Sequence, residues 1–76
     1  MPESHSFRGC VIEVVTRKFQ HSFFKKTYYD IASVTITRDG KQVDYPVKPY
    51  ENTNEAKVYK TALVHAQLFI AARYPE

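Results

Sequence analysis

The chain has no tryptophan, only one cysteine and two glycines, and no long hydrophobic run among its 76 residues. A lone cysteine, Cys10, excludes an internal disulfide and a metal site built from cysteines, so nothing requires an oxidising compartment. The N-terminus lacks the apolar segment of a signal peptide, and no run approaches the roughly 18 apolar residues of a membrane span. These absences predict a cytoplasmic protein.

A strong excess of one charge is also missing. Eleven Lys and Arg residues oppose eight Asp and Glu residues, which gives a formal net charge of +3. A dedicated nucleic-acid-binding domain of this size usually carries a larger positive excess. The chain is 43% hydrophobic and 25% charged, as in ordinary globular proteins, and it is long enough for one core only. We expect a single domain over residues 1–76, with a loose N-terminal arm at 1–6 and a folded core at 7–74.

Two segments have the composition of β-strands. Residues 10–18 are mostly β-branched, which favours an extended backbone, and their apolar side chains fall on both faces. The polar and aromatic residues 19–26 break the alternation and predict a connection. A second strand is expected over residues 27–38.

Asp39-Gly40 is the clearest local signal, because a two-residue type I′ turn needs positive φ at both positions. A turn there sets the register of a hairpin whose apolar side chains share one face, in the pairs Ile36 with Val43, Val34 with Tyr45, and Ala32 with Val47. Pro46 and Pro49 have no amide hydrogen, so this third strand is expected to be an edge strand or to end early.

A helix is expected from about Thr53 to Arg73. Asn52 and Glu55 have the spacing of a capping box, and Pro75 ends the helical pattern. The predicted fold class is α+β: a three-stranded antiparallel meander packed against one C-terminal helix, in the order β-β-β-α. Its core is expected to contain Ile12, Val14, Val34, Ile36, Val43, Tyr45, Tyr59, Leu63, Ala66 and Ile70.

One stretch combines positive charge with aromatic rings. Its four basic residues are Arg17, Lys18, Lys25 and Lys26, and three phenylalanines lie among them. The basic residues of such a segment can bind phosphates while its rings stack on bases. This combination predicts weak, sequence-nonspecific nucleic-acid binding, which is the alternative to the protein-contact function described next. The other interpretation is a hairpin tip whose lysines confer solubility and whose phenylalanines tuck under the sheet edge.

The first functional hypothesis is a small non-enzymatic protein that acts through protein contact, either with itself or with another protein. This hypothesis rests on an apolar strip on the outer side of the predicted helix. We expect the strip to act together with two valines on the outer face of the first predicted strand. The candidate interface residues are Val64, Leu68, Ala72, Val11 and Val15. Isolated aliphatic residues on a surface are also normal.

No pattern of catalytic, cofactor-binding or metal-binding residues is found. The three histidines, His5, His21 and His65, do not have the spacing of metal ligands, and no pair of carboxylates lies on one face. Cys10 alternates with Ile12 and Val14, which is typical of a small buried hydrophobic residue rather than a nucleophile. We expect no enzyme activity, no cofactor, no metal and no membrane partner.

Several short motifs carry a resemblance to known proteins. They are Phe7-Arg8-Gly9, Ile12-Glu13-Val14, Asp39-Gly40-Lys41 and Asn54-Glu55-Ala56, with Ala66 and Ile70 further along the helix. The chain resembles a group of short bacterial β-β-β-α proteins of unassigned function, a likeness that implies a fold and no site. It is more weakly similar to the three-strand-plus-helix DNA-binding domains of plant AP2 factors and phage integrases. Where those families place Arg and Trp, this chain has Thr35, Thr37 and Gln42.

Overall fold

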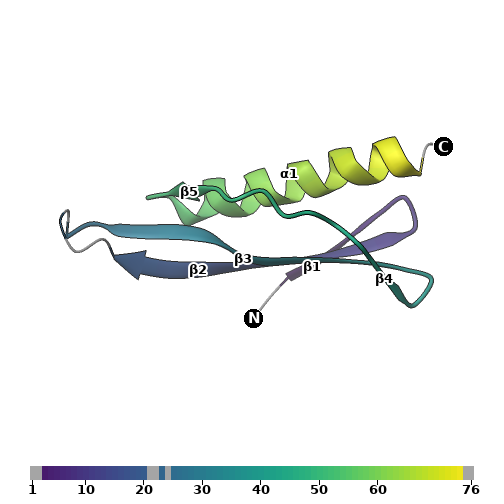
Figure 1. Ribbon diagram of the computed structural model, residues 1–76, viewed down its shortest axis with the longest axis horizontal. Coiled ribbons are helices and arrows are strands. Elements are labelled where there is room, and N and C mark those ends of the chain that lie inside the picture. The colour runs from purple at the N-terminus through teal and green to yellow at the C-terminus, as the bar shows by residue number, and fades with distance from the viewer. Residues whose placement is uncertain (1–2, 21–22, 24, 75–76) are drawn as a thin grey trace.

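The protein is an antiparallel β-sheet with one helix packed on one of its faces, as Figure 1 shows. The computed structural model describes residues 3–20, 23 and 25–74. In these residues the elements are β1 (Glu3–Phe7), β2 (Cys10–Gln20), β3 (Thr27–Arg38), β4 (Lys41–Val43), β5 (Glu51–Asn52) and α1 (Glu55–Arg73). The strands are ordered β1-β2-β3-β4, and β5 also pairs with β3. The predicted α+β class, with one C-terminal helix, is confirmed.

The prediction of a loose arm at residues 1–6 is wrong for the described part of that segment. Strand β1 pairs with β2 from Glu3 opposite Val14 to Phe7 opposite Cys10. Arg8 and Gly9, with φ of 49° and 78°, form the two-residue turn between the strands. Arg is an uncommon residue at positive φ, so the sequence carries only half of the usual turn signal here. The Arg38 guanidinium stabilises the turn by donating to the Arg8 carbonyl over 2.8 Å.

The longest hairpin joins β2 to β3, and its register shifts once. Val15 lies opposite Ser33 and Thr16 lies opposite Ile31, so Ala32 has no partner on β2. This bulge exchanges the faces of the following residues, and Ile31 packs against the core while Ala32 is exposed. The expected inward position of Ala32 is therefore wrong, because strict alternation ends at the bulge.

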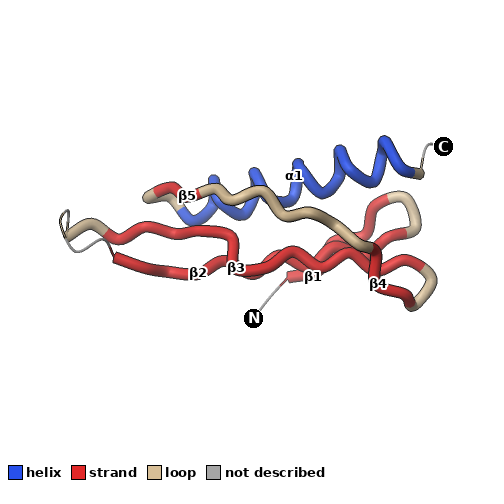
Figure 2. Tube along the Cα trace, in the orientation of Figure 1, coloured by secondary structure: helices blue, strands red, loops and turns tan. Residues whose placement is uncertain are grey.

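The turn at Asp39-Gly40 and the first pairs beyond it are as expected. Both residues have positive φ, and Ile36 lies opposite Val43. Strand β4 ends at Val43, so the predicted pairs of Val34 with Tyr45 and Ala32 with Val47 do not form. The chain leaves the sheet just before Pro46, runs beside the helix, and returns to β3 as the short β5 (Figure 2).

Helix α1 begins two residues later than expected. The cap is Asn54, whose side chain accepts hydrogen bonds from the backbone amides of Ala56 and Lys57. Asn52, predicted as the cap, instead accepts from the backbone amide of Asn54 over 2.9 Å. The helix ends at Arg73, two residues before Pro75.

The core lies between the helix and the inner face of the sheet. Its buried residues are Cys10, Ile12, Val14, Ile36, Ala62, Ala66 and Ile70. Val58, which was not predicted, is also fully buried. Five predicted core residues pack against this cluster but stay partly exposed: Val34, Val43, Tyr45, Tyr59 and Leu63.

Candidate functional site

The β2–β3 hairpin extends past the N-terminus of α1, as Figure 1 shows, and its tip carries the basic and aromatic residues. Strand β1 pairs only with Cys10–Val14 of β2, so the outer half of the hairpin continues without it. Pairing between β2 and β3 persists to Gln20 opposite Thr27. Phe19 and Gln20, predicted as part of a connection, are therefore strand residues.

Arg17 is the one basic residue of this stretch with an ion pair among the described residues. Its guanidinium donates two hydrogen bonds to the Asp30 carboxylate, of 3.1 Å and 2.5 Å, across the strands. These hydrogen bonds and the charge of Asp30 raise the pKa of Arg17 above its usual value. A guanidinium that is already paired with a carboxylate is a poor phosphate ligand, so we expect Arg17 to contribute less to phosphate binding than its charge suggests.

The three lysines of the tip are exposed, and the structure shows no ion pair between any of them and a described residue. Lys25 has a φ of 51°, and its carbonyl accepts a hydrogen bond from the Gln20 side chain over 3.0 Å. This hydrogen bond links the end of β2 to the end of the loop, where Lys25 and Lys26 lie. Lys18 lies two residues from Thr16, which hydrogen-bonds to Glu55 of the helix, so alternation places Lys18 on the helix side of the sheet.

Aromatic rings occupy two positions at the tip. Phe19 and Tyr28 stack on the other face of the hairpin, with ring centroids 5.9 Å apart and planes 28° apart. The side chain of Phe23 is 92% exposed in the loop itself. The alternative in which the phenylalanines tuck under the sheet edge is therefore wrong for Phe23. Phe24 and His21 lie outside the described residues.

The five candidate interface residues do not form one surface. Val11 and Val15 alternate with the buried residues of β2 and so face away from the helix. Val64, Leu68 and Ala72 lie on the outer side of α1, away from its buried stripe. The sheet and the helix layer separate the two groups. Leu68 is 63% exposed, more than any of the three valines in the set.

The histidines and the cysteine are dispersed. His5 lies on β1 and its Nε2 is 2.7 Å from the Tyr59 hydroxyl of the helix, and Cys10 is fully buried. His65 lines a cavity beside the β4–β5 connection. Among residues 3–20, 23 and 25–74, no group of three His, Cys, Asp or Glu side chains is placed to hold a metal ion.

No pattern in the sequence predicted that cavity. Its walls come from Tyr45, Pro46 and Lys48 of the connection and from His65, Leu68 and Phe69 of the helix. The available signal was Pro46 with Pro49, which prevents regular pairing and sends the chain away from the sheet. Which helix residues the connection would meet could not be read from that signal.

No helix in the described part of the chain has the length and apolar character to span a membrane. Comparison of the chain with protein-family models, with curated proteins and with solved structures finds no match.

Proposed function

We propose that the protein is a non-enzymatic binding module that holds single-stranded nucleic acid, without sequence preference, at the tip of the β2–β3 hairpin. Lys18, Lys25 and Lys26 would contact phosphates, and Phe23 would stack on a base. Positively charged grooves with protruding rings are the common means of binding single strands, because every base has a face on which a ring can stack.

The exposure of Phe23 is the observation that carries this proposal. Its side chain is 92% exposed, against 63% for Leu68, the next most exposed large hydrophobic residue described. A ring that contacts so little of its own chain contributes little to folding. The same ring is worth about 1–3 kcal/mol when a base stacks on it, so contact with a ligand accounts for its position.

A single strand fits the tip better than a duplex. The bases of a duplex are stacked on one another, and a protruding phenylalanine has no base face to meet. The outer face of the sheet carries Thr35, Thr37 and Gln42 where a reader of the major groove needs Arg or Lys. The expected ligand is therefore an unpaired segment of DNA or RNA.

The test is a salt titration of a fluorescent oligothymidylate of about 15 nucleotides, at the upper end of the site sizes of small binding domains. Three lysine contacts predict a slope of log affinity against log salt of about −2, at about −0.7 per contact. Lys25→Glu with Lys26→Glu should abolish measurable binding, because two attractive contacts become repulsive. Phe23→Leu should weaken binding about fivefold or more without changing the slope, because only stacking is lost.

The matched control is Lys57→Glu with Lys60→Glu, which makes the same change in net charge at two exposed lysines of the helix. This control should bind within about twofold of the natural chain once its general charge effect is screened at physiological ionic strength. Equal losses in the two double variants would mean that net charge alone attracts the oligonucleotide. A preference for vesicles rich in phosphatidylserine over the oligonucleotide would replace nucleic acid by a membrane surface.

A second candidate function is self-association, and the exposure of Leu68 favours it. Val64 and Leu68 are one helical turn apart and are 40% and 63% exposed. Ala72 continues the row and is small enough to let a second helix approach. We propose that two copies meet through this row, with the sheet faces on the outside of the dimer. Val11 and Val15 do not belong to this contact.

A further inference from the structure

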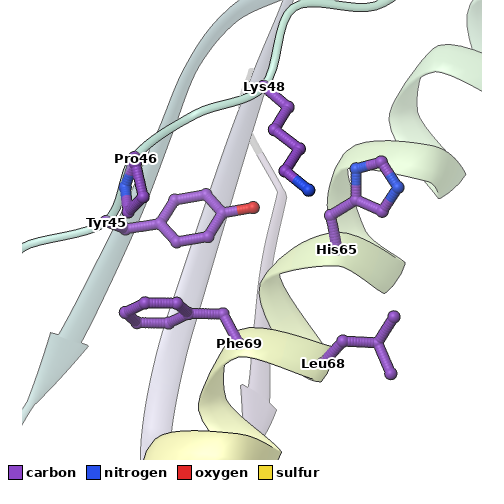
Figure 3. A pocket seen from close by; sticks show the side chains of 6 residues that line it. All are labelled: Tyr45, Pro46, Lys48, His65, Leu68 and Phe69. Atoms are coloured by element: carbon purple, nitrogen blue, oxygen red, sulfur yellow. The ribbon is translucent and has the colours of Figure 1, made fainter.

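A cavity of about 290 Å³ lies between helix α1 and the segment that connects β4 to β5. Figure 3 shows the six side chains that line it. Their surface is mostly apolar, with Pro46, Leu68 and Phe69 forming the walls. Its volume is close to the lower limit of small-molecule sites, so it suits a ligand no larger than one aromatic ring with a short side chain.

The cavity has a fixed aromatic wall. Tyr45 follows the end of β4, and its ring meets the ring of Phe69 edge to face, with centroids 4.9 Å apart and planes 71° apart. Edge-to-face pairs of this kind are a preferred aromatic geometry. Pro46 restricts the backbone beside this pair. The apolar part of the cavity is therefore formed before any ligand arrives.

The polar groups at the cavity are all able to donate hydrogen bonds. Figure 3 shows the Tyr45 hydroxyl, the Lys48 ammonium and the His65 ring on the same side of it. The Tyr45 hydroxyl is protonated at neutral pH, as for any tyrosine, and burial raises its pKa further, so it can donate a hydrogen bond. No carboxylate lines the cavity. One side is thus complementary to an anion and the other to an apolar group.

We propose that this cavity binds a small apolar monocarboxylate, with the carboxylate held by Lys48, Tyr45 and His65 and the apolar part placed against Phe69 and Leu68. Arylalkanoates such as 3-phenylpropionate have this combination of one ring, a short chain and one negative charge. A charge-assisted hydrogen bond is about twice as strong as a neutral one, which gives the charged head the larger share of selectivity.

This site is separate from the hairpin tip. His65 lies ten residues along α1 from Glu55, which is about 15 Å at 1.5 Å per residue, and Glu55 is at the end of the helix nearest the tip. The two proposals therefore use different residues and different ligands. Failure of oligonucleotide binding would leave the monocarboxylate site untouched, and the reverse also holds.

The experiment compares 3-phenylpropionate with its neutral amide and with 3-phenylpropylamine in chemical-shift titrations of the full chain. The acid should bind about tenfold more tightly than the amide, because the amide keeps the ring and loses the charge. The amine should bind least, because it places a cation beside Lys48. Shifts should concentrate in the backbone and ring signals of residues 45–48 and 65–69.

Two lysine variants distinguish the loss of the Lys48 charge from a loss of folding. Lys48→Met should reduce acid binding about tenfold, to the level of the amide, while leaving amide binding unchanged. Lys41→Met is the control, because it removes another exposed lysine, on β4, that does not line the cavity. Amide spectra that match the natural chain except near each substituted residue would establish that both variants fold.

Three results would overturn the proposal. One is equal affinity for the acid and the amide, which would leave only an apolar surface. Another is unchanged acid binding in Lys48→Met. The third is the absence of shifts with all three compounds at millimolar concentration.

Discussion

Asn52 and Asn54 illustrate how one residue type takes two roles at a helix start. Asn54 caps the helix by accepting from two backbone amides, at 2.9 Å from Ala56 and 3.3 Å from Lys57. Asn52 holds Asn54 itself, through the 2.9 Å hydrogen bond to its backbone amide. The capping box predicted from Asn52 and Glu55 is therefore wrong, because a box built on Asn54 would need Glu or Gln at position 57, where the chain has Lys57. Glu55 instead accepts a hydrogen bond from Thr16 of β2.

Replacement of Asn54 should measure the cap directly. Asn54→Ala leaves two amides of the first turn without their acceptor, and we expect a loss of about 1 kcal/mol in the free energy of unfolding. Asn54→Asp should keep the stability, because a carboxylate accepts the same bonds and favours the positive end of the helix dipole. Denaturant unfolding checks this through a lower midpoint with an unchanged slope. A loss in Asn52→Ala larger than that in Asn54→Ala would contradict the assignment.

At the scale of the elements, the sequence predicted the strands and turns whose residues carry the whole signal locally. Asp39-Gly40 supplies both residues of a type I′ turn, and the strand before it was predicted with its observed limits, Thr27–Arg38. The first strand was missed because its turn contains Arg8, and because its alternation of Ser4, His5 and Ser6 has few apolar residues. The His5 ring is hydrogen-bonded to Tyr59, which lies 54 positions further along the chain, and no local sequence pattern reveals such a contact.

The buried stripe of the helix was predicted only in part, because its exact position depends on how the helix packs on the sheet. Val58, Ala62, Ala66 and Ile70 follow one another at intervals of four and are all buried. The two alanines let the helix approach the sheet closely, so the stripe is narrow and its centre passes through Val58 rather than Tyr59. At the hairpin tip, the sequence identified the basic residues but not the pairing of Arg17 with Asp30, because the register there depends on the bulge at Ala32.

The attachment of β1 to the helix gives a prediction at this scale. Tyr59→Phe removes the hydroxyl that lies 2.7 Å from His5 Nε2. We expect the free energy of unfolding to fall by about 1 kcal/mol and the amides of β1 to exchange faster than those of β2 and β3. Native-state hydrogen exchange measures both. Tyr74→Phe is the control, since the structure shows no hydrogen bond from that hydroxyl to a described residue. Equal acceleration throughout the sheet would show that β1 does not open separately.

At the scale of the whole molecule, the helix covers one face of the sheet and leaves the other face without a layer in the described chain (Figure 1). The molecule is elongated, with extents of 46 × 22 × 18 Å, and the hairpin tip lies at one end of the long axis. The three proposed contacts lie at the tip, at the cavity beside the helix, and along the outer row of the helix. A ligand at the tip leaves the other two accessible, whereas the cavity and the helical row share Leu68 and would compete for it.

Self-association through the helical row can be separated from association through the open sheet face. Burying one leucine side chain fully is worth about 1.5–3 kcal/mol, so a contact centred on Leu68 predicts a weak dimer that is populated only at high protein concentration. Sedimentation velocity should show the natural chain shifting from monomer to dimer as its concentration rises.

Leu68→Glu should keep the chain monomeric over the same range, because a two-fold contact would bring two carboxylates together. Val15→Glu makes the same change of charge on the opposite side of the molecule and should dimerise like the natural chain. Dissociation by Val15→Glu but not by Leu68→Glu would move the interface to the open face of the sheet. A natural chain that remains monomeric at millimolar concentration would remove the dimer, and the hairpin tip and the cavity would remain as the proposed binding sites.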